Sequence, residues 1–179
     1  AFVFSYFLYQ KDLYKYIGIA IFIIMSVHGF YNYGKFINQF GWDPKRFRPA
    51  SEWIKNNSEN DEVVFNAAWE YFPELFFWNT KNRYIGGMDP VFQYVYDPNL
   101  YWESYYLETG KTTNFTCASI FCEENDLKNT YDVLKNDFKA SLVALSRPAD
   151  EKLYSYLLGD ARFSLGYKDD ASAVFKIIK

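Results

Sequence analysis

The feature that most constrains this chain is an uncharged run from Tyr16 to Gly34, bracketed by Lys15 and Lys35. A helix needs about 20 mostly apolar residues to cross a bilayer, and this run has that length. Tyrosines stand at both of its ends, as amphipathic rings do at a lipid–water boundary. We therefore expect the last membrane span of the chain over about 14–34.

This run has two alternative interpretations, a signal peptide and a buried helix of a soluble domain. A signal peptide would have a shorter apolar core and a small-x-small cleavage site after it, and no such site follows. A buried helix of a soluble domain would have the same composition. The aromatic content of 22% is typical of a membrane-proximal protein. An AT-rich genome is an alternative source of the excess of Tyr, Lys and Asn.

A second apolar stretch, 1–9, precedes a short charged segment, 10–15. We interpret 1–9 as the tail of an earlier membrane helix, so that the two would form a hairpin in a chain entered midway. The short loop carries Lys11 and Lys15, which favours a cytoplasmic location, because long domains translocate largely regardless of charge. Residues 36–179 are then expected on the extracytoplasmic side.

Charge and histidine content exclude several classes of function. The net charge is −3, so the chain lacks the basic field that nucleic acid requires, and we expect no nucleic-acid partner. The single histidine, His28, lies within the expected span. Its side chain either forms a hydrogen bond at the membrane interface or lies on a substrate path. The sequence contains no glycine-rich phosphate loop and no Ser/His/Asp set. We assign no catalytic residue and no metal ligand within this chain.

The pattern divides the chain into membrane segments over 1–35, a juxtamembrane connector over 36–48 and a domain over 49–179. In the domain, apolar spacing predicts helices over 50–56, 74–78, 100–107, 123–137 and 148–158, and strands over 63–66, 83–85, 141–145, 163–167 and 172–178. Such alternation indicates a small α/β domain. We expect a mostly parallel sheet that ends in an antiparallel β-hairpin.

The first two expected strands end in loops that are rich in polar and aromatic side chains. The strand 63–66 leads into Trp69–Pro73, and the strand 83–85 leads into Gly86–Pro90. Ligands of α/β domains usually bind where strands end in loops. We expect these two exits to meet at one edge of the sheet.

Five residues of this region are candidates for substrate binding: Trp69, Glu70, Tyr71, Asn82 and Asp89. Glu70 can bind a cation, or accept hydrogen bonds from a sugar hydroxyl while an aromatic ring stacks on the sugar. Alternatively, the aromatic residues belong to the core, Glu70 stabilises a helix dipole and Asp89 caps the next segment. The two carboxylates suit acid–base or metal chemistry only if they are adjacent.

Cys117 and Cys122 are the two cysteines of the chain. Outside the cytoplasm they are candidates for a local disulfide, provided that their Cα atoms lie within about 7 Å. A zinc site is disfavoured, because no further cysteine and no nearby histidine can complete four ligands.

Three segments resemble the C-terminal end of GT-C-type polytopic membrane glycosyltransferases, a superfamily that includes protein O-mannosyltransferases and oligosaccharyltransferases. They are Trp-Ile-Lys-x-Asn at 53–57, Trp-Glu-Tyr-Phe-Pro-Glu-Leu-Phe-Phe-Trp-Asn at 69–79 and Asn-Arg-Tyr-Ile-Gly-Gly-Met-Asp-Pro at 82–90. The resemblance implies a polyprenyl-phosphate sugar as donor, and a glycan or protein as acceptor. The donor and acceptor would bind through an N-terminal part that precedes this chain, and the lipid bilayer is a further expected partner.

Oligosaccharyltransferases of this superfamily carry Trp-Trp-Asp-Tyr-Gly after the first strand of their soluble domain, where it recognises the acceptor sequon. Here Ala68–Phe72 occupies a comparable place but differs at three of the five positions, so sequon binding is not carried over. The resemblance places the catalytic acidic residues in an upstream external loop. A divalent cation, if one is used, would be bound with those upstream residues.

The chain alone is therefore expected to be inactive. It would contribute the last membrane helix and a domain for acceptor recognition. The alternative is a non-catalytic, membrane-anchored domain that binds a glycan or a protein of the cell envelope.

Overall fold

The computed structural model describes residues 12–40, 43 and 45–178. The chain separates into two compact units, 1–43 and 44–179, and each is described by itself. The stretch 1–9, which the sequence suggests is the tail of a preceding helix, lies outside the described residues.

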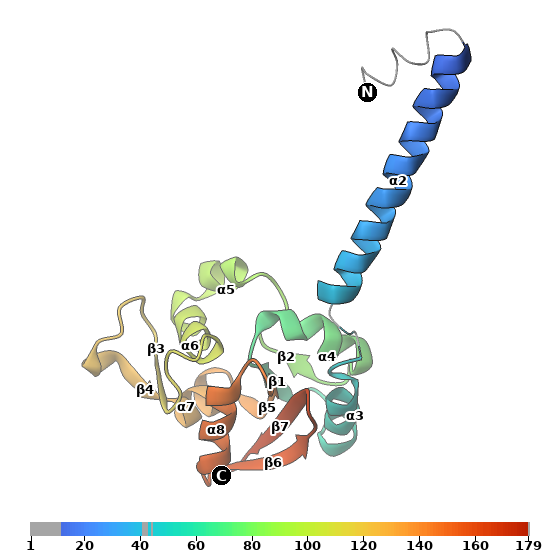
Figure 1. Cartoon of the computed structure of the whole chain (residues 1–179). Helices are drawn as coiled ribbons and strands as arrows, with labels where there is room; N and C mark the ends of the chain where they lie inside the picture. Colours follow the sequence, from blue (N-terminus) through green and yellow to red (C-terminus); the bar gives the residue numbers. More distant parts are fainter. Residues whose placement is uncertain (1–11, 41–42, 44, 179) are drawn as a thin grey trace. The chain divides into compact units, whose positions relative to one another are not determined.

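The first unit contains one long helix, α2, from Asp12 to Phe40 (Figure 1). Its part Tyr14–Phe36 is long and apolar enough to cross a membrane, and it is the one such helix among the described residues. Only 6% of the apolar window is buried, whereas the core helix of a soluble domain would be mostly buried. The side chains of His28 and Asn32 share a hydrogen bond of 2.9 Å.

The second unit is built on a five-stranded sheet with the order β2-β1-β5-β7-β6. The strands are β1 (Val63–Asn66), β2 (Arg83–Tyr84), β5 (Ala140–Ser146), β6 (Phe163–Lys168) and β7 (Ser172–Ile177). β1 pairs in parallel with β2 and β5, and β7 pairs antiparallel with β5 and β6. The α/β class and the terminal hairpin are confirmed, and the sheet as a whole is mixed.

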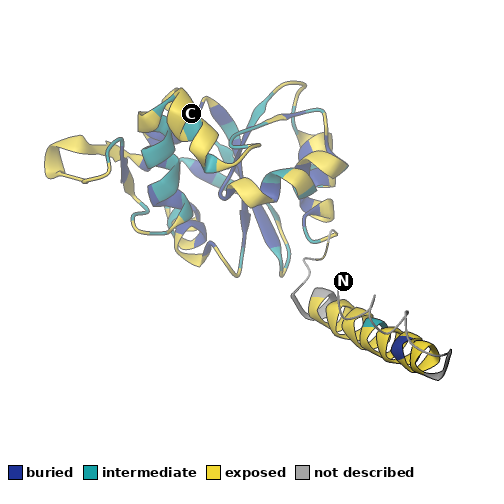
Figure 2. Ribbon diagram, turned by 90° about the horizontal axis from the view of Figure 1, so that it is seen from above, coloured by how far each residue is buried: buried dark blue, intermediate teal, exposed yellow. Residues whose placement is uncertain are grey.

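Helices cover both faces of this sheet. The helices are α3 (Arg48–Asn57), α4 (Phe72–Trp78), α5 (Pro90–Tyr96), α6 (Pro98–Glu108), α7 (Thr130–Asp132) and α8 (Glu151–Gly159). The Phe175 ring lies 5.7 Å from Tyr154 of α8, and Lys176 lies over the Trp53 ring of α3 at 5.3 Å. Since neighbouring residues of a strand point to opposite faces, α8 and α3 cover opposite sides. The buried residues lie between these layers (Figure 2).

The helix expected over 123–137 was wrong in its first half. Residues Glu124–Asp126 form a 3₁₀ turn and Leu127–Asn129 form β4, which pairs antiparallel with β3 (Phe115–Cys117). The helix begins only after Asn129, whose side chain accepts a hydrogen bond from the amide of Tyr131 at 3.0 Å. This cap fixes the start of the helix at Thr130, about two turns later than the expected start at 123.

The structure joins Cys117 and Cys122 by a disulfide, with Cα atoms 5.6 Å apart. The bond closes the loop between β3 and β4, which forms an arm at the side of the domain (Figure 1). Helix α5 was not among the expected helices, although the sequence offered Asp89 as the cap of a following segment.

We expect Gly166→Ala to destabilise the domain by about 1–3 kcal/mol, because the new Cβ would overlap the ring of Trp53. The matched control is Gly159→Ala, where a Cβ meets nothing within 4 Å. It should leave stability unchanged or raise it slightly. Urea unfolding of the full chain in detergent micelles, followed by tryptophan fluorescence, measures both changes. Equal stability of the two variants would contradict the packing described.

We expect reduction by dithiothreitol to speed cleavage by Glu-C protease after Glu123 or Glu124. Two strands as short as β3 and β4 are marginal without a cross-link, so the arm should open when the bond is reduced. The control is cleavage after Glu59, an exposed residue of the turn before β1. Its rate should stay constant, and equal acceleration at both places would indicate global unfolding instead.

Candidate functional site

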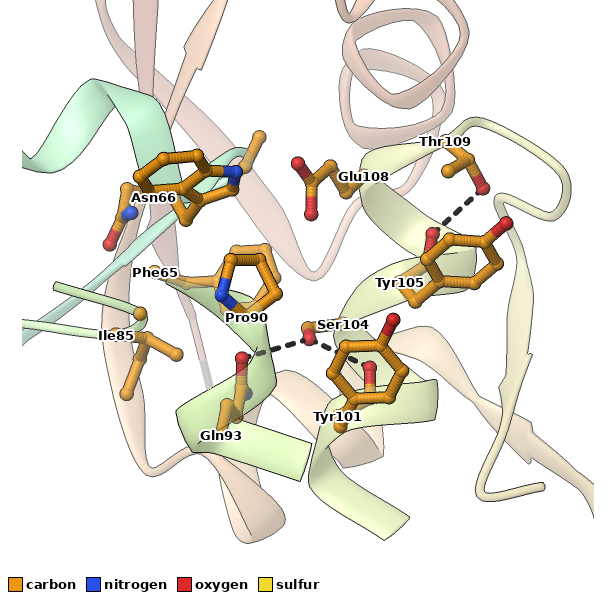
Figure 3. A pocket seen from close by; sticks show the side chains of 13 residues that line it. Phe65, Asn66, Ile85, Pro90, Gln93, Tyr101, Ser104, Tyr105, Glu108 and Thr109 are labelled. Atoms are coloured by element: carbon orange, nitrogen blue, oxygen red, sulfur yellow. Dashed lines mark hydrogen bonds between the residues drawn. The ribbon is translucent and has the colours of Figure 1, made fainter. Parts of the chain in front are cut away.

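A cavity of about 200 Å³ opens at the carboxyl ends of β1 and β2 (Figure 3). Its walls come from the residues after these strands and from α5 and α6. A Cβ placed on Gly86 would lie 3.7 Å from the Cβ of Trp69, so the two strand exits do meet, as the sequence predicts. Gly86 has a φ of 69°, a left-handed conformation that favours glycine.

The position of the cavity follows from the topology of the sheet. The chain passes from β1 to β2 through α4, and it returns past β1 to β5 through α5, α6 and α7. The strand order thus reverses at β1. Crevices at the carboxyl ends of strands, at such reversals, are the usual ligand sites of open α/β sheets.

The lining combines aromatic rings with a few polar groups. The rings are those of Phe65, Trp69, Tyr101 and Tyr105, and the polar side chains include Asn66, Gln93, Ser104 and Glu108. Four residues of α6, namely Tyr101, Ser104, Tyr105 and Glu108, recur at helical spacing and so share one face of that helix. Aromatic surface together with a few convergent polar groups is the usual composition of a small-ligand site.

Hydrogen bonds fix several of these polar groups, and one buried acceptor beside them has no partner among the described residues. Ser104 Oγ donates to the Tyr101 carbonyl at 2.9 Å and contacts Gln93 Oε1 at 3.4 Å. Asn66 Nδ2 donates to the Ala68 carbonyl at 2.9 Å. Asn66 Oδ1 is buried and has no hydrogen-bond partner among the described residues. This oxygen is closed to solvent, so it is a buried acceptor beside the cavity and not a group exposed in it.

One carboxylate, Glu108, lines the cavity, and the charges of two carboxylates outside its lining act on it. Glu108 projects into the space between α6 and the exit of β1 (Figure 3). Burial, and then the charges of Glu70 and Asp150, raise the pKa of Glu108 to about 7. Burial is also the main cause that raises the pKa of Asp150 to about 6, against hydrogen bonds from the Ser146 amide and the Tyr71 hydroxyl. Near neutral pH, the cavity thus contains a carboxyl group that can be either protonated or ionised.

A metal site is not evident in this geometry. Within the part of the chain that the structure describes, no three His, Cys, Asp or Glu side chains are placed to hold a metal ion.

The structure brings one of the five candidate residues into the lining of the cavity. Trp69 lines it, and Glu70 is an exposed neighbour that influences Glu108 through its charge. Tyr71 is only 2% exposed and packs in the core, 4.9 Å from the Phe47 ring.

The other two candidates have structural contacts elsewhere. Asp89 caps α5 by accepting a hydrogen bond from the Val91 amide at 3.0 Å. Asn82 precedes β2, at the opposite end of that strand, and accepts from Asn79 Nδ2 at 2.8 Å. Glu70 and Asp89 do not line the cavity together, so the carboxylate that faces it is Glu108.

Sequence reasoning missed Gln93, Ser104 and Glu108. A signal was present for the last two, because their spacing with Tyr101 and Tyr105 marks a helix face on which polar and aromatic residues alternate. Nothing in the sequence indicated that this face turns toward the exit of β1.

Comparison of the sequence with models of known protein families gives no match, and comparison with curated proteins gives none either. The chemistry of the cavity is therefore the basis for assigning a function.

We expect the free energy of unfolding to rise as pH falls from about 8 to about 5. Glu108 has a pKa of about 7 when folded and 4.5 as a reference value, so the folded state binds its proton more tightly and gains stability on protonation. Asp150 acts in the same direction.

In Glu108→Gln this rise should shrink by roughly 1–2 kcal/mol, after allowance for the partial exposure of the side chain. Urea unfolding at several pH values measures it, with Glu123→Gln on the exposed arm as the control. An unchanged pH profile in Glu108→Gln would refute the assignment.

Proposed function

We propose that the cavity binds one sugar unit of a glycan acceptor. We further propose that the chain is the acceptor-recognising, C-terminal part of a membrane glycosyltransferase that uses polyprenyl-phosphate sugars. The observation that carries the proposal is the lining of the cavity. Sugars present apolar C–H faces, which suit Trp69 and the two tyrosines, and hydroxyls, which suit amide, hydroxyl and carboxyl groups.

The size of the cavity supports a single sugar ring. Sites for drug-sized ligands measure roughly 300–1,000 Å³, and this cavity measures about 200 Å³. Glu108 adds adaptability, because a carboxyl group with a pKa of about 7 can accept or donate a hydrogen bond at neutral pH.

The membrane setting rests on three observations. Helix α2 has the length and composition of a span. The Cys117–Cys122 disulfide favours an oxidising compartment, which supports an extracytoplasmic location for 36–179. The segments over 69–79 and 82–90, on which the resemblance to GT-C-type glycosyltransferases is based, supply the two strand exits at the cavity. The catalytic acidic residues would lie upstream, so the chain itself contributes recognition and no chemistry.

The second candidate is a non-catalytic, membrane-anchored domain that binds a glycan or a protein of the cell envelope. The upstream coding sequence separates the two. Eight or more further membrane spans, with an acidic pair in the first external loop, would favour the glycosyltransferase. A start codon just before residue 1 would rule it out and favour the anchored domain.

We expect Trp69→Ala to weaken sugar binding at least about tenfold, because the exposed ring forms one wall of the cavity. The matched control is Phe77→Ala, which removes a ring that is 73% exposed in α4 and does not line the cavity. Saturation-transfer NMR of the full chain, in a detergent without a sugar headgroup, would screen neutral hexoses, N-acetylhexosamines and amino sugars. Failure of every sugar to bind, or equal losses in both variants, would refute the proposal.

A further inference from the structure

Helix α5 leaves its apolar side largely exposed, and Met88, Phe92 and Tyr96 on this side border a shallow pocket. The exposed fractions of Val91, Phe92, Val95 and Tyr96 are 55%, 56%, 78% and 85%, and Met88 just before the helix is 63% exposed. No residue of α5 is buried. These side chains form what we term the α5 apolar surface.

The opposite side of the helix makes its contacts with the domain. Gln93 Oε1 lies 3.4 Å from Ser104 Oγ, and the Tyr94 ring lies 5.3 Å from the Tyr101 ring of α6. At about 100° per residue, 93 and 94 occupy one arc of the helix and the apolar surface occupies the other. A helix at a water-facing surface normally has the reverse orientation, with its apolar stripe toward the core. An exposed apolar patch of this kind marks a contact surface.

The short connector is one reason to consider a bilayer as the occupant of this surface. Helix α2 ends at Phe40 and α3 begins at Arg48. Even fully extended, 41–47 can reach only about 25 Å. If α2 spans the membrane, the bilayer is therefore a permanent neighbour of the domain at high effective concentration.

The chemistry of the surface suits the headgroup boundary of a bilayer. It combines Phe and Tyr with Val and Met, and residues 90–96 carry no charge. Asp89 and Asp97, at the two ends of α5, are engaged as helix caps. Amphipathic rings and apolar side chains partition to this boundary, and a surface without Lys or Arg has no need of anionic lipids.

We propose that the α5 apolar surface docks on the lipid bilayer at the depth of the headgroups. This docking does not depend on the ligand of the cavity. It has one consequence that does rest on the proposed function. Pro90 and Gln93 of α5 also line the cavity, so a docked α5 holds the sugar site next to the membrane surface, where a lipid-linked or membrane-bound acceptor would present its glycan.

The test uses nitroxide spin labels on the full chain in phosphatidylcholine nanodiscs that hold one copy each. Val91→Cys and Val95→Cys each place a label on the surface, while the native cysteines stay protected in their disulfide. Lys55→Cys and Asn60→Cys are exposed controls at the other end of β1. Power-saturation EPR with oxygen and with a water-soluble nickel chelate reports contact with lipid and with water.

We expect both labels on α5 to show a several-fold higher ratio of oxygen to nickel accessibility than both controls. A ratio equal to that of the controls would place α5 in water and overturn the proposal. Labels shielded from both reagents would point to a protein partner or to an intramolecular contact, which also overturns it. The two labelled positions are exposed and independent, so failure of one variant to fold leaves the other as a test.

Discussion

The parallel pairing of β1 with β5 is the interaction on which the rest of the domain depends. It joins segments from the two halves of the chain, and the amide of Ala67 extends it by donating to the Ala144 carbonyl at 2.9 Å beyond the end of β1. β5 is buried on nearly its whole length, as expected for a central strand covered on both faces. With β5 on one side and β2 on the other, β1 must end in a crevice between two helical layers. Strand order, more than any single residue, creates the cavity.

The carboxylates at and near the cavity lower the stability of the domain, but they keep a polar group available to a ligand. Glu108 and Asp150 hold negative charge in partly buried surroundings, and Glu70 adds to the field. Removing carboxylates from water is unfavourable, and the raised pKa values express that cost. Asp150 recovers part of it through a hydrogen bond from the Ser146 amide at 2.8 Å. The Glu108 carboxyl group has no such partner within the part of the chain that the structure describes. Ionisable groups that are partly removed from water without a hydrogen-bond partner are frequently found at ligand sites.

Much of the domain was predictable because its signals are local. The strands at 63–66 and 141–145, the hairpin at 163–178 and the meeting of the two strand exits all follow from short apolar patterns and from the edge geometry of sheets. The arm formed by β3 and β4 was missed, because Leu127 shares helical spacing with Tyr131 although it lies in a strand outside the core.

Helix α5 and Glu108 were missed for a different reason. The apolar residues of α5 are exposed and lie outside the core, so no core pattern marks them. Glu108 acquires its properties only from neighbours distant in the sequence. Of the five candidate residues, Trp69 was found by the rule that ligands bind where strands end. Asn82 precedes its strand, so the same rule, applied to the expected strand at 83–85, would have excluded Asn82 from the cavity.

The turn that follows α7 restricts how many residues the chain can have between α7 and β5. Residues Val133–Asp137 form a π-helical turn, in which the Phe138 amide reaches back to the Val133 carbonyl at 3.0 Å. Such a turn holds one residue more than a regular α-helical turn. The additional residue sets the angle at which Phe138 leaves the helix, and the Phe138 ring packs 5.1 Å from Phe65. Deleting one residue here would regularise the helix and rotate that ring by about 100°, away from β1. Packing of Phe138 in the core therefore requires a fixed number of residues in this turn. Related chains should tolerate substitutions here more readily than deletions.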